Sequence, residues 1–263
     1  SAIVVKAKQE PRYTIVRNGE PWEQTFLALR DLALSDDGTK LAATVQVEQL
    51  PEADILKFME GTWSVAVDGE AWDQKFINVY APSISPDNAR VGVEIRTDIA
   101  EYTICENGVS WNSVGSCIWE PCYRSDGRLI VPLKVEGGWT LAEDDGLLWK
   151  RRYIQLWHQR ISPDGRSVAA VVAPDYGQWT IAVDDVPWRA TFSDMVDAPV
   201  FSQEGGHVAA AVKSKGRWGI AVDGKSWSDT YDMVWDPVLS PDGGAVVAKV
   251  EEHGQYSVAA NGK

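Results

Sequence analysis

The sequence predicts an all-β protein, specifically a β-propeller of four-stranded blades. Three observations lead to this fold class. An aromatic position recurs every 37 to 40 residues with one spacing of 50, an Asn-Gly or Asp-Gly pair follows it, and a Ser-Pro-Asp-Gly type of turn lies between copies. Self-similarity at such a period is typical of a repeat architecture, and the turns make each repeat a small antiparallel sheet.

The first repeating element is a hairpin whose leading strand opens on an aromatic residue. That aromatic is Tyr13, Trp63, Tyr102, Trp139, Trp179, Trp218 and Tyr256. The turn pairs that follow are Asn18-Gly19, Asp68-Gly69, Asn107-Gly108, Asp145-Gly146, Asp184-Asp185, Asp223-Gly224 and Asn261-Gly262. A second tryptophan comes after the turn, at positions 22, 72, 111, 149, 188 and 227. Asn and Asp tolerate the positive φ angles of tight hairpins, and aromatics repeated in every copy are typical of packing between blades.

The second repeating element is a Ser-Pro-Asp-Gly turn or a variant of it. Copies lie at 35–38, 85–88, 124–127, 162–165, 202–205 and 240–243. Each is followed by an apolar run, and runs that are apolar on both faces suit strands buried between sheets. Each blade therefore has strand A before this turn and strand B after it. Strand C carries the first aromatic, and strand D carries the second tryptophan.

Counting the strands gives seven blades, with one strand missing from the first blade and one from the last. A six-bladed ring is the alternative, although it leaves a well-formed hairpin copy unused. We expect one propeller domain over residues 1–263, with an insertion near 49–60 where the spacing is 50 residues. The apolar spacing of this insertion predicts one short helix at the rim of the second blade.

The composition is acidic and poor in cysteine. A formal charge of −13 argues against binding nucleic acid or anionic lipid by charge alone and favours a basic protein partner. Three cysteines without a Cys-x-x-Cys pair give neither a disulfide framework nor a zinc site. The sequence has no apolar stretch of transmembrane length and its N-terminus does not read as a signal peptide, so we expect no membrane insertion. The sparse cysteines favour a reducing, cytoplasmic location.

A third recurring position changes identity from blade to blade, which distinguishes it from the packing aromatics. It is expected where strand D crosses to the next strand A, on the propeller face where ligands usually dock. The residues in this position are Arg30, Tyr80, Trp119, Trp157, Asp197 and Trp235, and their polar neighbours are Asp31, Glu120, His158 and Asp236. Trp, Tyr and Arg are typical of interface hot spots, and the acidic neighbours would repel acidic competitors. These ten residues are the predicted partner-binding site, at one mouth of the central channel.

Signals of catalysis or of a bound metal are weak. Three histidines fall in different blades, and only His158 lies near predicted carboxylates. The sequence has no nucleophile elbow, zinc-protease motif or phosphate-binding glycine loop, and its Asp-Asp-Gly turns lack the calcium-loop pattern. We therefore predict no catalytic residue, no metal and no cofactor. Carbohydrate binding is a competing prediction, and Asp31, Glu120, Asp197 and Asp236 would offer the carboxylates of a hydrolase.

The Ser-Pro-Asp-Gly turns resemble the WD40-like repeats of the TolB propeller family over nearly the whole chain. The hairpins at 63–72, 179–188 and 218–227 also resemble those of the tryptophan-rich cytoplasmic subunit, TmcD, of the Tmc transmembrane electron-transfer complex of sulfate-reducing bacteria. This second resemblance implies a non-catalytic accessory subunit without a redox cofactor, with iron–sulfur and membrane cytochrome subunits as partners. The prediction is thus a cytoplasmic interaction module, with a binder of a small molecule or a carbohydrate as the alternative.

Overall fold

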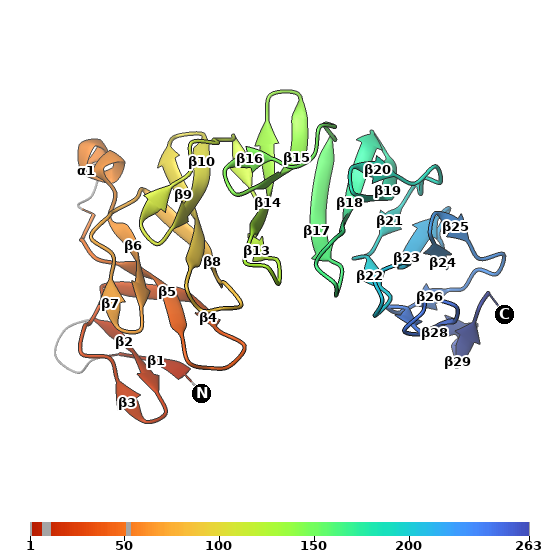
Figure 1. Cartoon of the computed structure of the whole chain (residues 1–263), viewed down its shortest axis with the longest axis horizontal. Helices are drawn as coiled ribbons and strands as arrows, with labels where there is room; N and C mark the ends of the chain where they lie inside the picture. Colours follow the sequence, from red (N-terminus) through yellow and green to blue (C-terminus); the bar gives the residue numbers. More distant parts are fainter. Residues whose placement is uncertain (1, 7–11, 51–53, 263) are drawn as a thin grey trace. The chain divides into compact units, whose positions relative to one another are not determined.

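The computed structural model describes residues 2–6, 12–50 and 54–262, which form seven antiparallel sheets and one short helix. Within each sheet, strands close in sequence pair with one another (Figure 1). The sheets are blades of the β-propeller class, and their number agrees with the predicted count of seven. In the described part of the chain, no helix is long and apolar enough to cross a membrane.

The chain divides into two compact units. Unit 1 contains Ser1–Val135 and Ala142–Gly146, and unit 2 contains Glu136–Leu141 and Leu147–Lys263. The expectation of one propeller domain over the whole chain stays a prediction.

The first three sheets lie in unit 1, and the division between the units runs through the fourth. The first three sheets consist of β1 (Ala2–Lys6), β2 (Tyr13–Arg17) and β3 (Glu20–Pro21); β4 (Ala28–Leu34), β5 (Leu41–Gln46), β6 (Trp63–Val67) and β7 (Glu70–Ala71); and β8 (Asn78–Ile84), β9 (Val91–Asp98), β10 (Glu101–Glu106) and β11 (Val109–Ser110). The fourth consists of β12 (Cys117–Ile118), β13 (Cys122–Tyr123), β14 (Leu129–Val135), β15 (Gly138–Glu143) and β16 (Gly146–Leu147).

The last three sheets lie in unit 2. They consist of β17 (Gln155–Ile161), β18 (Val168–Asp175), β19 (Gln178–Val183) and β20 (Val186–Pro187); β21 (Met195–Val196), β22 (Val200–Phe201), β23 (Val208–Ser214), β24 (Arg217–Val222) and β25 (Lys225–Ser226); and β26 (Met233–Val234), β27 (Val238–Leu239), β28 (Val246–Glu252) and β29 (Gln255–Ala260).

The core lies between successive sheets. Strand B is buried on both faces in β5, whose first five residues are all buried, whereas buried and exposed residues alternate in β28 of the seventh sheet. In β6, Val65 packs with Val79, Val91 and Ile95 of the next sheet. The apolar run of β5 therefore forms a strand without alternation because its sheet is covered on both sides.

The Ser-Pro-Asp-Gly turns close through their own side chains. In the copy at 162–165, the Ser162 hydroxyl donates to Asp164 Oδ1 at 2.6 Å and accepts from the Ser167 N–H at 2.9 Å. Asp164 Oδ1 also accepts from the Arg166 N–H at 3.1 Å. This local network reverses the chain between strands A and B without help from another element, which explains why the motif recurs.

The Asn-Gly and Asp-Gly pairs form the turns between strands C and D. Asp223 and Gly224 have φ values of 49° and 77°, and the Asp223 carboxylate accepts the Val208 N–H at 2.9 Å. The pair predicted at Asp145-Gly146 is wrong by one residue, because the positive φ values fall on Asp144 and Asp145. Asp144 caps Leu129 in the fourth sheet as Asp223 caps Val208 in the sixth, so the side-chain cap fixes the position of the turn.

Tryptophans of strand D pack on the turn of the following blade. A Cβ added to Gly69 would lie 3.3 Å from the ring of Trp22, and one added to Gly224 would lie 3.1 Å from Trp188. Gly224 must therefore lack a side chain both for its positive φ and for this approach. This contact supports the assignment of the second tryptophan series to packing between blades.

The insertion near 49–60 contains the predicted short helix, although residues 51–53 lie outside the described part. Helix α1 (Ile55–Glu60) begins after Asp54, whose carboxylate accepts the Lys57 N–H at 2.9 Å. Lys57 pairs with Glu48, to which Lys75 also donates at 2.5 Å. The helix is thus capped at its first turn and attached by charge to the segment before it.

Candidate functional site

The predicted site residues lie at an interruption in the middle of strand A. In β4 the register shifts between Arg30 and Leu32, and β8 and β17 have equivalent bulges. In the fourth, sixth and seventh sheets strand A is split into two short strands, and the site residue follows the first of them. The prediction that these residues lie in the crossing from strand D is therefore wrong. Asp31 and His158 show the reason, since their φ values of 48° and 54° break a strand that resumes beyond them.

The six predicted residues of the variable position (Arg30, Tyr80, Trp119, Trp157, Asp197 and Trp235) each lie opposite the fourth residue of strand B. Backbone bonds from Trp119 to Pro132 and from Trp235 to Lys249, of 3.1 and 3.0 Å, fix this register in the split strands. In β8 the residue opposite Tyr80 is Glu94. The six residues in this strand B position are Thr44, Glu94, Pro132, Val171, Ala211 and Lys249. A charged side chain at this strand B position, such as that of Glu94, lies beside the predicted site. The sequence analysis did not include Glu94 among the predicted site residues.

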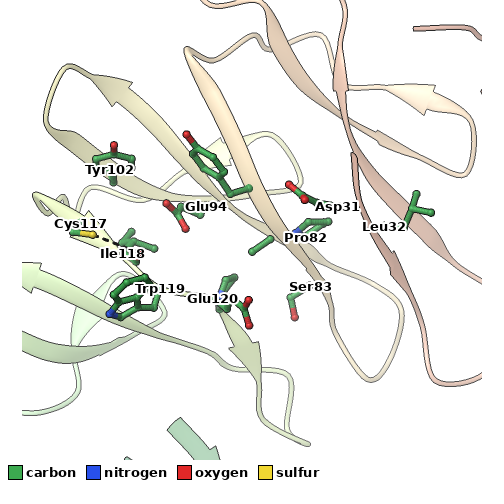
Figure 2. Close-up of a pocket in the computed structure, with 13 residues that line it drawn as sticks. Asp31, Leu32, Pro82, Ser83, Glu94, Tyr102, Cys117, Ile118, Trp119 and Glu120 are labelled. Carbon is green, nitrogen blue, oxygen red and sulfur yellow. Dashed lines mark hydrogen bonds between the residues drawn. The ribbon is translucent and has the colours of Figure 1, made fainter. Parts of the chain in front are cut away.

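A pocket of about 620 Å³ lies beside the interruptions of unit 1. Its lining comes from β4, β8, β9, β10, β12 and the segment that follows β12 (Figure 2). Six lining residues give it its chemistry: the carboxylates Asp31, Glu94 and Glu120, and the aromatic residues Tyr80, Tyr102 and Trp119. The described lining contains no lysine, arginine or histidine. The pocket is therefore both acidic and aromatic.

Glu94 is the most perturbed carboxyl group of this pocket. Burial, together with the smaller effect of the negative charges of Asp31 and Glu120, raises its pKa from 4.5 to about 7. The side chain is half-buried on β9, whereas Asp31 and Glu120 are exposed. Titratable groups with strongly shifted pKa values in a cleft are typical of functional sites.

Arg30 supports the pocket wall rather than lining the pocket. Its guanidinium lies 4.2 Å from the ring centroid of Trp63 and 5.0 Å from that of Tyr80. It also donates to the Val79 carbonyl at 3.0 Å, and its Nε lies 3.5 Å from Asp31 Oδ2. Held in this way, Arg30 positions one aromatic and one carboxylate of the pocket and partly offsets the charge of Asp31.

The remaining predicted residues lie in unit 2. The rings of Trp157 and Trp179 are 4.8 Å apart, and His158 meets Trp157 edge-on at 6.4 Å. Burial raises the pKa of Asp197, the charge of Asp236 raises it further, and His158 lowers it. His158 and Asp236 are thus the two charged neighbours that act on Asp197.

Trp235 belongs to a second aromatic contact of unit 2. The Lys249 ammonium lies 4.3 Å from the Trp235 ring centroid and 4.7 Å from that of Tyr256. Trp157 and Trp235 are half-buried, whereas Trp119 in unit 1 is 44% exposed. Trp119 thus offers the most accessible indole of the three.

Comparisons with known proteins return propellers of several kinds. No protein-family model and no curated protein matches the sequence. Among solved structures, the chain is similar to TolB from Acinetobacter baumannii, with a TM-score of 0.43, 18% identity and coverage of 86% of this chain and 61% of that one. A TolB structure from Agrobacterium tumefaciens gives a TM-score of 0.42, 19% identity and coverage of 74% and 79%.

Puromycin hydrolase is a further similar structure. Its TM-score is 0.48 at 14% identity, and 94% of this chain matches 48% of that chain. The chain thus spans about three fifths of the Acinetobacter TolB and about half of the hydrolase. These likenesses carry no argument about activity, because fold and function are separable in propellers.

Proposed function

We propose that this protein is a non-catalytic interaction module that binds a protein partner at the acidic, aromatic pocket of unit 1. The observation that carries the proposal is the pocket itself, where an exposed tryptophan lies beside three carboxylates from three sheets. Tryptophan and tyrosine give large contact areas at interfaces, and the carboxylates select the partner by charge. With a chain charge of −13, a basic partner is favoured.

The thiol that lines the pocket, Cys117, lacks the activation of a catalytic nucleophile, which supports a non-catalytic role. Burial raises the pKa of the Cys117 thiol, and the charge of Glu94 raises it further. A thiol held in its protonated form is a poor nucleophile, since the thiolate is the reactive species.

A finer proposal rests on the tryptophan-rich repeats alone. By their resemblance to the Tmc subunit, we propose a cytoplasmic accessory subunit of an electron-transfer complex, with iron–sulfur and membrane cytochrome subunits as partners. The role needs no cofactor of its own, because the partners supply the redox centres.

Affinity capture from lysate of the native host tests the proposal. The wild type is run beside a Trp119→Ala/Glu120→Gln variant and a Tyr176→Ala control, whose side chain is 83% exposed in a hairpin turn far along the chain. Captured proteins are identified by mass spectrometry, and folding is checked by circular dichroism. We expect one identified basic partner to be retained by the wild type and the control but lost by the pocket variant. Equal capture by all three would place the interface elsewhere.

A second candidate, a carbohydrate-binding hydrolase, is favoured by one observation. Glu94 has a pKa near 7, which suits a general acid or base, and Asp31 and Glu120 lie in the same pocket. A thermal-shift screen of sugars followed by hydrolysis assays separates the candidates. Turnover by the wild type that is lost in Glu94→Gln would replace the interaction module with an enzyme.

A further inference from the structure

The connection between β5 and β6 is longer than the equivalent connections of other sheets. It spans residues 47–62, whereas each connection from strand B to strand C in the third to seventh sheets has two residues. Two residues are therefore enough to close such a hairpin. The longer connection carries α1, which the blade does not need in order to form, and surface segments of this kind often carry function.

Helix α1 exposes large aliphatic side chains. Ile55 is 62% exposed and Leu56 is 74% exposed, and none of the residues of α1 is buried. A surface helix normally turns its apolar side chains toward the core. In α1 these side chains instead remain in contact with water, from which their removal is favourable.

Arg96 joins α1 to the turn between β9 and β10. Its guanidinium carbon lies 5.8 Å from the ring centroid of Phe58 on α1. The same guanidinium donates to the carbonyls of Asp98 at 2.9 Å and of Ile99 at 2.5 Å, both in the turn. Phe58 follows Ile55 by three residues, so the two side chains lie on one side of the helix. Ile99, which is 67% exposed, therefore extends the apolar surface of α1.

This apolar surface, which we call the α1 patch, is separate from the unit 1 pocket. It consists of Ile55, Leu56, Phe58 and Ile99, and none of these four residues lines the pocket. A group of exposed aliphatic residues on a segment that the fold does not need is typical of an interaction surface.

The charge around the α1 patch indicates what covers it. The two segments that form the patch, 54–60 and 96–101, contain four carboxylates and two cations. Both cations are engaged, since Lys57 pairs with Glu48 and Arg96 binds the turn carbonyls. The four carboxylates are all exposed and belong to Asp54, Glu60, Asp98 and Glu101. A second copy would bring the same negative charge to the contact, whereas a basic partner would complement it.

We infer that the α1 patch binds a segment of a protein partner that presents aliphatic side chains flanked by lysine or arginine. The aliphatic side chains cover Ile55, Leu56 and Ile99, and the basic side chains pair with the surrounding carboxylates. The same carboxylates disfavour an anionic lipid surface. The inference goes beyond the proposed function, because it adds a second binding surface that does not depend on the pocket.

Fluorescence anisotropy of labelled peptides titrated with the full chain tests the inference. The probe is a peptide of about 14 residues whose leucines and lysines are spaced to form an amphipathic helix. Two matched peptides carry glutamate in place of lysine, or serine in place of leucine. We expect the leucine–lysine peptide to bind at least about tenfold more tightly than either matched peptide.

Variants of the α1 patch locate the binding. Leu56→Ser/Ile99→Ser removes the two most exposed side chains of the patch and should weaken binding of the leucine–lysine peptide at least about fivefold. Tyr176→Ser removes an exposed side chain from the equivalent turn between β18 and β19 and should leave binding unchanged. Glu60→Gln should weaken binding more than Glu70→Gln, which removes an exposed carboxylate from β7. Circular dichroism checks that each variant folds.

Several results would overturn the inference. No binding of the leucine–lysine peptide, equal binding of the glutamate peptide, or an equal loss in Leu56→Ser/Ile99→Ser and Tyr176→Ser would exclude a basic, aliphatic partner at this surface. A dimer in sedimentation that becomes a monomer in Leu56→Ser/Ile99→Ser would assign the α1 patch to a second copy. Binding to phosphatidylcholine vesicles that is lost in the same variant would assign it to lipid.

The pocket variant Trp119→Ala/Glu120→Gln separates this inference from the proposed function. It should bind the leucine–lysine peptide as the wild type does. If it does so, but affinity capture finds no partner that depends on the pocket, the α1 patch stands and the pocket proposal fails. If capture depends on the pocket but the peptide does not bind the wild type, the pocket proposal stands and the α1 patch fails.

Discussion

Replacing Glu94 with glutamine changes the pH dependence of stability. Burial and the neighbouring carboxylates raise the pKa of Glu94 from 4.5 to about 7, so the folded state favours the protonated form. Between these two values the folded chain binds more protons than the unfolded chain, and the free energy of unfolding falls as pH rises. The stability contributed by protonated Glu94 is full below pH 4.5 and is lost as pH rises through 7.

The size of this effect follows from the pKa change. Moving from 4.5 to about 7 corresponds to about 3 kcal/mol. Glutamine keeps the shape of the protonated carboxyl group and cannot ionise. We therefore expect Glu94→Gln to be close to the wild type at pH 4.5 and more stable by up to about 3 kcal/mol at pH 8.5. In a chain of this size that is a rise of roughly 6–10 °C in the unfolding midpoint.

Thermal unfolding monitored by circular dichroism from pH 4.5 to 8.5 measures the difference. Glu70→Gln is the matched control, because it removes the same charge from an exposed position on β7. Its midpoint should follow the wild type at every pH within about 2 °C, since a lone exposed charge contributes little. A constant difference in midpoint between Glu94→Gln and the wild type across this pH range would show that the folded state does not favour the protonated form of Glu94.

Three further substitutions test the packing of the blades. Gly224→Ala places a Cβ 3.1 Å from Trp188 at a φ of 77°, and should cost about 2 kcal/mol in chemical denaturation. Arg124→Met removes the buried one of the two arginines that donate to Glu143, at 2.6 Å, and should cost about 2–3 kcal/mol because Glu143 is only 13% exposed and keeps only the exposed Arg128 as a partner. Trp139→Ala truncates an indole that is 3% exposed, and should cost about 3–5 kcal/mol.

Each of these substitutions has a control in the same chain. Gly177→Ala has a similar φ of 66° but meets nothing within 4 Å, so it should cost less than Gly224→Ala. Arg128→Met removes the more exposed partner of Glu143 and should cost less than about 1 kcal/mol. Trp119→Ala truncates an exposed indole and should leave the unfolding midpoint within about 3 °C of the wild type. An equal loss of stability in a substitution and its control would contradict the contact assigned to the substituted residue.

The blades could be predicted from the repeats because each repeat forms its turns and strand caps with its own residues. A turn such as Ser162 to Gly165 closes with its own hydrogen bonds, and Asp223 caps the strand it faces, so short motifs fix both ends of each strand. The one-residue error at Asp145 arose because the pair Asp-Gly was read as the turn, whereas the capping carboxylate of Asp144 sets its position.

The sequence predicted some residues that line the unit 1 pocket but not Glu94, because the role of Glu94 depends on contacts between different strands. The variable position led to Tyr80 and Trp119, since a residue that differs between blades is not needed for the repeat. Glu94 was missed, although a single charge in the apolar run 91–95 was a visible signal. The environment of Glu94 depends on its pairing with Tyr80 of β8 and on the charge of Asp31, which is distant in sequence. A motif within one repeat does not include these contacts.

Photo-crosslinking in cells of the native host tests whether a protein partner binds at the unit 1 pocket. Benzoylphenylalanine replaces Trp119 in the pocket or Tyr176 at an exposed turn, and crosslinked proteins are identified by mass spectrometry. We expect one identified protein to be crosslinked from position 119 and no such product from position 176. The same products from both positions, or none from position 119, would contradict it.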